Sequence, residues 1–113
     1  MNQLLELNKY VQTGASIYLD DGRQAPDGFI RTKSVNETIE LIELLEANHI
    51  NINLLDLDHD LGEFAGDGGD AIKLLDYLVE HEKFYPIKLH TFNWVARDNM
   101  QRMLDRFWPK ENH

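Results

Sequence analysis

Apolar and polar residues follow one another along this chain in blocks that predict strands and helices in alternation. Short apolar runs bounded by turn residues predict strands, and the run that ends at Leu57 is the densest of them. That run lacks the alternation of a half-exposed strand, so we expect it at the centre of the sheet, covered on both faces. The four predicted strands cover residues 16–19, 29–32, 50–57 and 87–91.

Helical spacing of apolar residues predicts a helix after the second, third and fourth strands. The first ends near Asn48, the second follows the glycine-rich loop 62–69, and the third ends before Pro109. The apolar stripe of the second helix is Ile72, Leu75, Leu78 and Val79. The expected N-terminal caps are Ser34 with Glu37 as a capping box, Asp67 or Asp70, and Asn93.

Alternating strands and helices imply right-handed crossovers and a mainly parallel sheet. A length of 113 residues fits one domain. We therefore predict a single-domain α/β fold, a three-layer α/β/α sandwich with about four strands, over residues 16–108. Residues 1–15 form an N-terminal extension, with a short helix expected from the spacing of Leu4, Leu7 and Val11, and residues 109–113 form a tail.

Composition narrows the classes of function. The formal net charge of −9 repels polyanions, which argues against broad non-specific nucleic-acid binding, although the excess of acid also fits solubility alone. Cysteine is absent, so a metal must use carboxylates, carbonyls, imidazole or water, which favours Mg²⁺ or Mn²⁺. The sequence has no apolar run of roughly 20 residues and no signal peptide, so we expect no membrane span and a cytoplasmic location.

Titratable residues gather where three predicted strands end. Asp20-Asp21 follow the first strand, Asp58-His59-Asp60 the third, and His90-Thr91 close the fourth. The carboxyl ends of parallel strands meet at one edge of a sheet, and ligands bind there. Crowded carboxylates repel one another unless a cation binds or a pKa rises, so this edge is a candidate cation site. An isolated Asp-Asp pair fits a turn equally well.

Three further features allow two interpretations each. Asp56 either adds a fourth acid to the cluster or points away from it. His90 is either a hydrogen-bonded core residue or shares general acid and base work with His59, which cleavage of a phosphoester requires. Phe92 and Trp94 either stack a base or, more commonly for such residues, pack in the core.

Arginines lie near the predicted strand ends. Arg23 follows the first acidic pair, Arg31 ends the second strand, and Arg97 lies one turn into the helix that Asn93 caps. Guanidinium groups in such positions suit phosphate oxygens, and a helix N-terminus adds free backbone amides. The alternative is that each arginine pairs with a neighbouring acid.

Together these motifs resemble the cyclic-phosphate processing receiver-like family, a shortened relative of response-regulator receiver domains. The matching segments are Tyr18 to Pro26, Arg31-Thr32, Leu57 to Gly62, and His90 to Asn93 with Arg97, Asn99 and Met100. The resemblance implies a truncated flavodoxin-like topology and a role in acting on cyclic-phosphate nucleotides or RNA ends. It also implies that Asp20 and Asp21 are the acidic metal-binding pair, that Asp58 stands at the phosphoacceptor position, and that Thr91 is the hydroxyl residue after the fourth strand.

The chain departs from receivers after His90-Thr91, where only one helix remains. It therefore lacks the fifth strand and the lysine that a receiver uses to bridge an acyl phosphate, which disfavours phosphorelay signalling. A haloacid-dehalogenase phosphatase places two aspartates at the spacing of Asp58 and Asp60, but only about 50 residues follow Asp60, too few for that larger sheet.

We therefore predict a metal-dependent phosphoesterase that binds and processes a cyclic phosphate on a nucleotide or RNA end. The alternative is a non-catalytic receiver-like module that binds a phosphorylated ligand or a protein. The predicted catalytic residues are His59, His90 and Asp60; the metal ligands are Asp20, Asp21 and Asp58; the phosphate-binding residues are Arg23, Arg31, Thr91, Asn93, Arg97 and Asn99.

Overall fold

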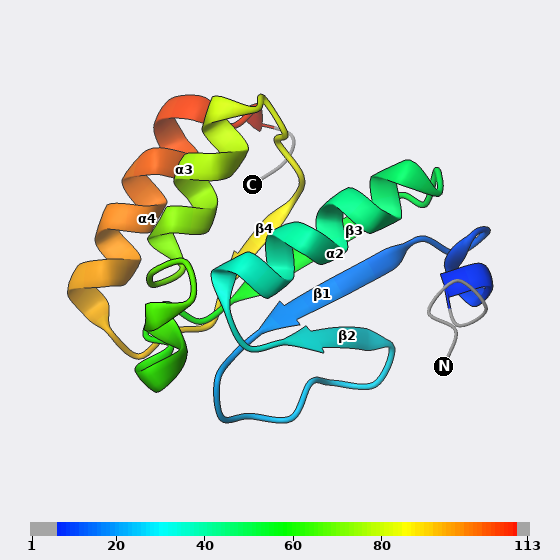
Figure 1. Ribbon diagram of the computed structural model, residues 1–113. Coiled ribbons are helices and arrows are strands. Elements are labelled where there is room, and N and C mark those ends of the chain that lie inside the picture. The colour runs from blue at the N-terminus through cyan, green and yellow to red at the C-terminus, as the bar shows by residue number, and fades with distance from the viewer. Residues whose placement is uncertain (1–6, 111–113) are drawn as a thin grey trace.

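A computed structural model describes residues 7–110 (Figure 1). The strands are β1 (Ala15–Leu19), β2 (Phe29–Thr32), β3 (Ile52–Leu57) and β4 (Ile87–Leu89). The helices are α2 (Val35–Ala47), α3 (Ile72–Glu80) and α4 (Trp94–Phe107), with short 3-10 helices η1 (Asn8–Tyr10) and η2 (Gly62–Gly66).

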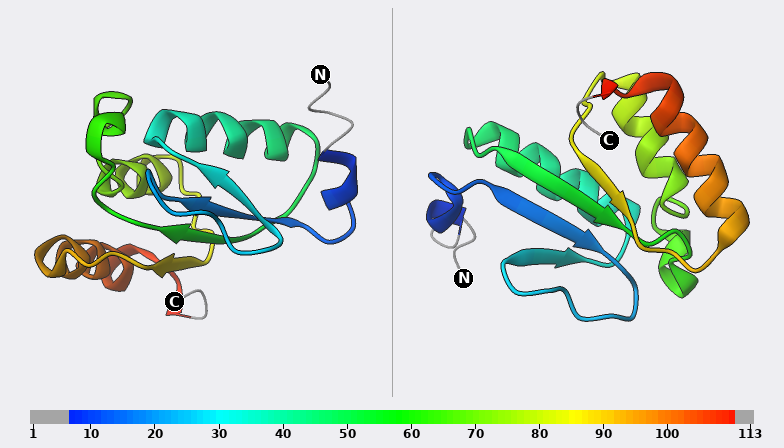
Figure 2. Two further views of the ribbon diagram at one scale, coloured as in Figure 1. Left: turned by 90° about the horizontal axis from the view of Figure 1, so that it is seen from below. Right: turned by 180° about the vertical axis from the view of Figure 1, so that it is seen from behind.

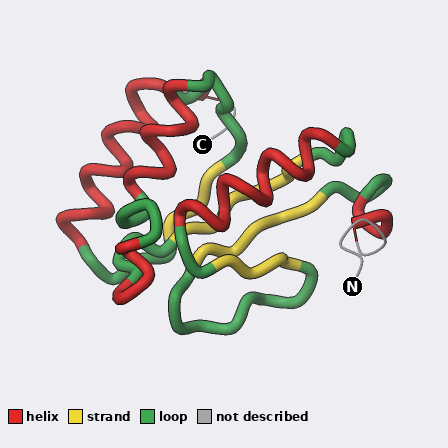
Figure 3. The backbone as a smooth tube through the Cα atoms, in the orientation of Figure 1, coloured by secondary structure: helices red, strands yellow, loops and turns green. Residues whose placement is uncertain are grey.

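The four strands form one parallel sheet in the order β2-β1-β3-β4. Helix α2 connects β2 to β3, α3 connects β3 to β4, and α4 follows β4. Figure 1 shows α2 across the sheet, with α3 and α4 side by side near β4, and in the left view of Figure 2 α4 lies on the opposite side from α2. Between β1 and β2 the chain is a loop (Figure 3). The predicted α/β class, single domain and truncated flavodoxin-like sheet are confirmed.

The main core lies between the sheet and helices α2 and α3. Ile17 pairs with Leu55 and Leu19 with Leu57, so all four side chains lie on one face, and none is exposed. The helices contribute the buried residues Ile42, Leu45, Leu74, Leu75 and Leu78. Burying one such side chain stabilises the fold by about 1.5–3 kcal/mol, so this layer fixes the strands whose ends carry the acids.

Two helix caps are as predicted. Ser34 Oγ accepts a hydrogen bond from the amide of Glu37 at 3.1 Å, and Asn93 Oδ1 accepts one from the amide of Ala96 at 3.0 Å. The Glu37 carboxylate accepts from the amide of Lys33 at 2.8 Å, one residue before the position expected in a capping box.

The predicted cap of α3 is wrong. The helix begins after Ala71, which makes no side-chain cap, because both candidate aspartates are engaged elsewhere. Asp67 accepts from Ser34 Oγ at 2.7 Å, which fastens the β3–α3 loop to the start of α2. Asp70 accepts from the amide of Leu61 at 3.0 Å and closes that loop on itself.

Some boundaries also differ from the prediction. Strand β3 begins at Ile52 and β4 ends at Leu89, each two residues inside the predicted limits. On α3, Leu74 is buried, whereas Ile72 and Val79 are only half-buried. In the predicted N-terminal helix, Leu7 is buried and Val11 is exposed, and only the short η1 forms among the described residues; Leu4 lies outside them. No helix in residues 7–110 is long and apolar enough to cross a membrane.

Candidate functional site

Asp20, Asp58 and His90 each follow a strand, and the three strands end in register. Leu19 pairs with Leu57, and Leu57 with Leu89. The ladder continues one residue further, because the amide of Asp58 donates to Leu19 O and that of His90 to Leu57 O, both at 2.9 Å. One ligand atom from each of Asp20, Asp58 and His90 lies within 4.8 Å of the others. The structure therefore brings these three predicted residues together.

Asp56 belongs to this cluster, and the interpretation that it points away is wrong. It lies on the sheet face opposite Leu55 and Leu57, is 4% exposed, and its Oδ1 lies 2.5 Å from His90 Nδ1. The signal was available in the sequence, because a carboxylate inside an apolar strand requires a polar partner. His90 is this partner. Asp56 pairs with Lys88 in the register of β3 and β4, and His90 lies two residues after Lys88.

His90 is held on both sides. Its Nε2 lies 3.0 Å from Asp20 Oδ2, opposite the Nδ1 contact with Asp56, and its ring stacks on Tyr18 at a centroid distance of 4.3 Å and an interplanar angle of 2°. Both ring nitrogens therefore face carboxylate oxygens, Nδ1 that of Asp56 and Nε2 that of Asp20. His90 thus links the buried acid of β3 to the acid that follows β1.

Asp20 is also held by its own loop. Its Oδ1 accepts hydrogen bonds from the amides of Gly22 and Arg23, both at 2.9 Å, so the residue forms a turn as well as part of the cluster. Burial acts to raise the pKa of Asp20, but these amides and His90 outweigh it and hold the pKa below its ordinary value. Asp20 is therefore a carboxylate fixed in position and in charge.

Asp21 does not join that cluster. Its Oδ2 lies against Gly62, where an added Cβ atom would approach it to 2.6 Å. Gly62 also has a φ of +57°, in the left-handed region that favours glycine. The Gly62 backbone therefore makes room for Asp21 at the rim of the site.

The pKa of Asp58 is raised, whereas that of Asp20 is lowered. Burial raises its pKa, the negative charge of Asp20 raises it further, and hydrogen bonds from the Thr91 hydroxyl and the His59 amide offset this only in part. The His59 amide lies 2.8 Å from Asp58 Oδ1. The surroundings of Asp58 therefore disfavour its charged form, a penalty that a bound cation would offset.

His59, Asp60 and Asn93 form a second hydrogen-bonded set. His59 Nδ1 lies 2.8 Å from Asp60 Oδ1, and Asn93 Nδ2 donates to both oxygens of Asp60 at 3.2 and 3.1 Å. The hydrogen bond to His59 lowers the pKa of Asp60, and Asn93 adds to the effect. Asp60 therefore fixes one ring nitrogen of His59, and no described residue bonds to the other.

The predicted arginines are free of ion pairs within residues 7–110. Arg31 Nε donates to the backbone oxygen of Asp20 at 3.3 Å, and the Arg23 guanidinium lies 4.8 Å from the centroid of the Phe92 ring. Arg97 is exposed, one turn beyond Asn93. No described carboxylate lies within ion-pair distance of these three residues, so the alternative that each pairs with an acid does not hold.

Two other predicted residues have contrasting positions. Thr91 is buried, 6% exposed, and its Oγ1 accepts from the amide of Asn93 at 3.1 Å, so it joins the Asp58 and Asn93 sides of the site. Asn99 is exposed in the second turn of α4 and has no described contact with the acids.

Phe92 and Trp94 are 79% and 75% exposed, so the expectation of core packing is wrong for both.

The acidic clusters could hold a metal ion. One comprises Asp20, Asp58 and His90; the other comprises His59, Asp60 and Asp70, of which Asp70 was not among the predicted site residues. In the first cluster, Asp56 behind His90 provides the outer carboxylate that commonly orients an imidazole ligand. Two carboxylates with one imidazole offer oxygen and nitrogen ligands of the kinds that divalent cations take in proteins.

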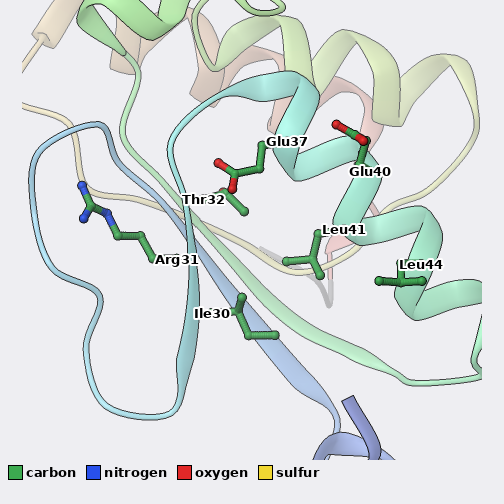
Figure 4. Close-up of a pocket in the computed structure, with 7 residues that line it drawn as sticks. All are labelled: Ile30, Arg31, Thr32, Glu37, Glu40, Leu41 and Leu44. Carbon is green, nitrogen blue, oxygen red and sulfur yellow. The ribbon is translucent and has the colours of Figure 1, made fainter. Parts of the chain in front are cut away.

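A surface pocket of about 430 Å³ lies between β2 and α2 (Figure 4). Its lining residues are Ile30, Arg31, Thr32, Glu37, Glu40, Leu41 and Leu44. Only Arg31 is shared with the predicted site, so the acidic clusters lie outside this pocket.

Comparison with known proteins gives one match. The model of the family described as cyclic-phosphate processing receiver domain matches residues 15–106. This range begins with β1 and ends inside α4, so it includes all four strands and both acidic clusters. The searches of curated proteins and of solved structures gave no match.

Proposed function

The chain belongs to the cyclic-phosphate processing receiver family, and on this premise we propose that it hydrolyses a cyclic phosphodiester on a nucleotide or RNA end, assisted by a divalent cation. In this reaction water attacks phosphorus, one ring P–O bond breaks, and the products are a phosphomonoester and a free hydroxyl group. Hydrolysis needs charge stabilisation at the phosphate and a proton for the leaving oxygen. The two clusters supply residues suited to each task.

Asp20, Asp58 and the Nε2 side of His90 are the proposed cation ligands. A bound divalent cation would polarise the phosphate and offset the two carboxylates. Asp20 is suited to this role because backbone amides and His90 keep it charged. Asp58 is suited because a cation removes the electrostatic penalty that raises its pKa.

Arginines and the start of α4 are the proposed phosphate ligands. Arg23 and Arg97 have guanidinium groups without an ion pair among the described residues, although the chain carries 20 acidic residues. Such unpaired guanidinium groups beside an acidic cluster suit an anionic ligand. Arg31 supports the β1–β2 loop through Asp20 O, and Thr91 places its hydroxyl beside Asp58.

His59 is the proposed proton donor to the leaving oxygen. Asp60 binds its Nδ1, and Asn93 in turn holds Asp60, which fixes the ring while leaving Nε2 without a described partner. A histidine oriented by a carboxylate on one nitrogen and open at the other is the usual arrangement for proton transfer. His90, whose Nδ1 faces Asp56, is assigned to the cation through Nε2.

The observation that carries this proposal is the meeting of Asp20, Asp58 and His90 at adjacent strand ends, within 4.8 Å. A receiver-type phosphoryl transfer is not proposed, because in residues 7–110 only α4 follows β4 and no fifth strand carries a lysine.

The test is incubation with 2′,3′-cyclic nucleotides and Mn²⁺, followed by separation of the products. We expect a phosphomonoester from the wild type and a fall of about 10²–10⁴ in rate for His59→Ala, the range typical of a lost general acid. His81→Ala is the matched control, because His81 is an exposed histidine at the end of α3. Nucleotide binding without product would instead favour the non-catalytic binding module, and a His59→Ala protein as active as the control would contradict the role of His59.

A further inference from the structure

An exposed apolar patch borders the proposed phosphate site. Phe92, Trp94 and Val95 are 79%, 75% and 73% exposed, and they are three of the four consecutive residues from Phe92 to Val95. Single exposed apolar residues are ordinary, but three large ones together usually mark a binding surface. Further along α4, Ala96, Met100 and Leu104 are buried and Phe107 is 39% exposed, so the most exposed apolar side chains gather at the start of the helix.

This patch is continuous with the site. Phe92 follows Thr91, and Trp94 follows Asn93, whose side chain holds Asp60. The Arg23 guanidinium lies over the Phe92 ring at 4.8 Å and so joins the β1–β2 loop to the patch. Arg97 lies three residues after Trp94, on the same surface of α4. An aromatic surface therefore adjoins the proposed phosphate ligands Arg23 and Arg97.

We propose that Trp94 stacks the base of a nucleotide whose cyclic phosphate occupies the acidic site, with Phe92 and Arg23 beside it. The inference rests on the proposed function and makes a nucleotide, rather than a small cyclic phosphodiester without a base, the substrate class. Base stacking on an aromatic ring tolerates any base, so the patch selects nucleotides without reading their sequence. A protein partner fits less well, because three side chains offer much less than the roughly 800 Å² that each partner buries in a stable interface.

Trp94 allows a direct binding test. It is exposed, whereas Trp108 is 4% exposed and donates its Nε1 hydrogen to Tyr85 O, so a stacked base should quench Trp94 fluorescence alone. Adenosine 2′,3′-cyclic phosphate is compared with glycerol 1,2-cyclic phosphate, which carries no base, in the presence of Mn²⁺. The His59→Ala protein is used so that turnover does not consume the ligand.

We expect Trp94→Ala to weaken binding of the nucleotide by about 5- to 150-fold, the loss that removal of one stacked base produces. Trp94→Phe should restore most of this affinity, and Val95→Ala, an equally exposed neighbour without a ring, should not change it. Removing both the indole from the protein and the base from the ligand should lower the binding affinity no more than removing either one, because both deletions break the same contact.

Two results would overturn the inference. One is equal affinity of adenosine 2′,3′-cyclic phosphate and glycerol 1,2-cyclic phosphate for the His59→Ala protein that keeps Trp94. The other is an affinity for the nucleotide that Trp94→Ala leaves unchanged. Either would assign the patch to another partner. Failure of the proposed function looks different, because the wild type would then convert neither ligand to product even if Trp94-dependent binding of the nucleotide persists.

Discussion

Replacing Asp58 by Asn should stabilise the metal-free protein while it abolishes the proposed activity. Asp58 lies within 4.8 Å of Asp20, and burial together with that neighbouring charge raises its pKa. Two unit charges at this separation repel by about 3.5 kcal/mol at an effective dielectric constant of 20. Hydrogen bonds from Thr91 and His59 and the facing His90 reduce this penalty, so we expect a net gain of about 1–2 kcal/mol.

The assay is thermal unfolding in the presence of EDTA, with circular dichroism as the signal. A gain of this size raises Tm by roughly 5–10 °C for a domain of about 100 residues. The difference should be complete at pH 7 and should shrink as the pH falls through the raised pKa of Asp58, because the wild-type carboxyl then takes up a proton in the folded state. Below the ordinary value of 3.8 both states are protonated and the difference disappears.

Asp27→Asn is the control, since Asp27 is an exposed carboxylate in the β1–β2 loop and should show no such gain. Addition of Mn²⁺ should make the wild type the more stable of the two proteins. The cation binds to and stabilises the folded wild type, whereas the Asp58→Asn variant lacks one of its ligands. An Asp58→Asn protein that is equally or less stable than the wild type in EDTA at pH 7 would refute the electrostatic reasoning.

Three further predictions concern the surroundings of the site. Gly62→Ala should destabilise the fold by about 1–2 kcal/mol in urea unfolding, because residue 62 has positive φ and the new Cβ meets Asp21; an unchanged midpoint would contradict the close approach. Asp56→Asn should weaken Mn²⁺ binding about 10- to 100-fold by calorimetry, through loss of the carboxylate behind His90, and unchanged affinity would exclude this role. Asp67→Asn should lower Tm at neutral pH, since Ser34 and Asn36 hold the pKa of Asp67 down; this stability is present above pH 3.8 and is lost as the pH falls through the lower folded value, so an equal loss at all pH values would contradict it.

Much of the fold could be predicted from the sequence because its apolar pattern is regular. The run ending at Leu57 predicted a central strand, and β3 indeed lies between β1 and β4. The convergence of Asp20, Asp58 and His90 followed from parallel topology alone, since in-register strands bring their ends together. Local signals sufficed for the caps at Ser34 and Asn93, where the accepting oxygen and the amide are three residues apart.

What the sequence did not predict depends on contacts between distant residues. Asp67 and Asp70 have the composition of a cap, but Ser34 and Leu61 engage them once the loop folds. Asp56 inside an apolar strand signals a polar partner, but only the register of β3 and β4 identifies that partner as His90, 34 residues away. The exposure of Phe92 and Trp94 is likewise set by the entry of α4, whose buried face begins at Ala96.

Hydrolysis of a 2′,3′-cyclic nucleotide with Mn²⁺ in ¹⁸O-labelled water tests the central claim most directly. The wild type should release a phosphomonoester that carries one labelled oxygen from the attacking water, and Asp58→Asn should release none above the rate without protein. Labelled product formed equally fast by Asp58→Asn, or no product from the wild type, would contradict the assignment of the acidic strand ends to cyclic-phosphate hydrolysis.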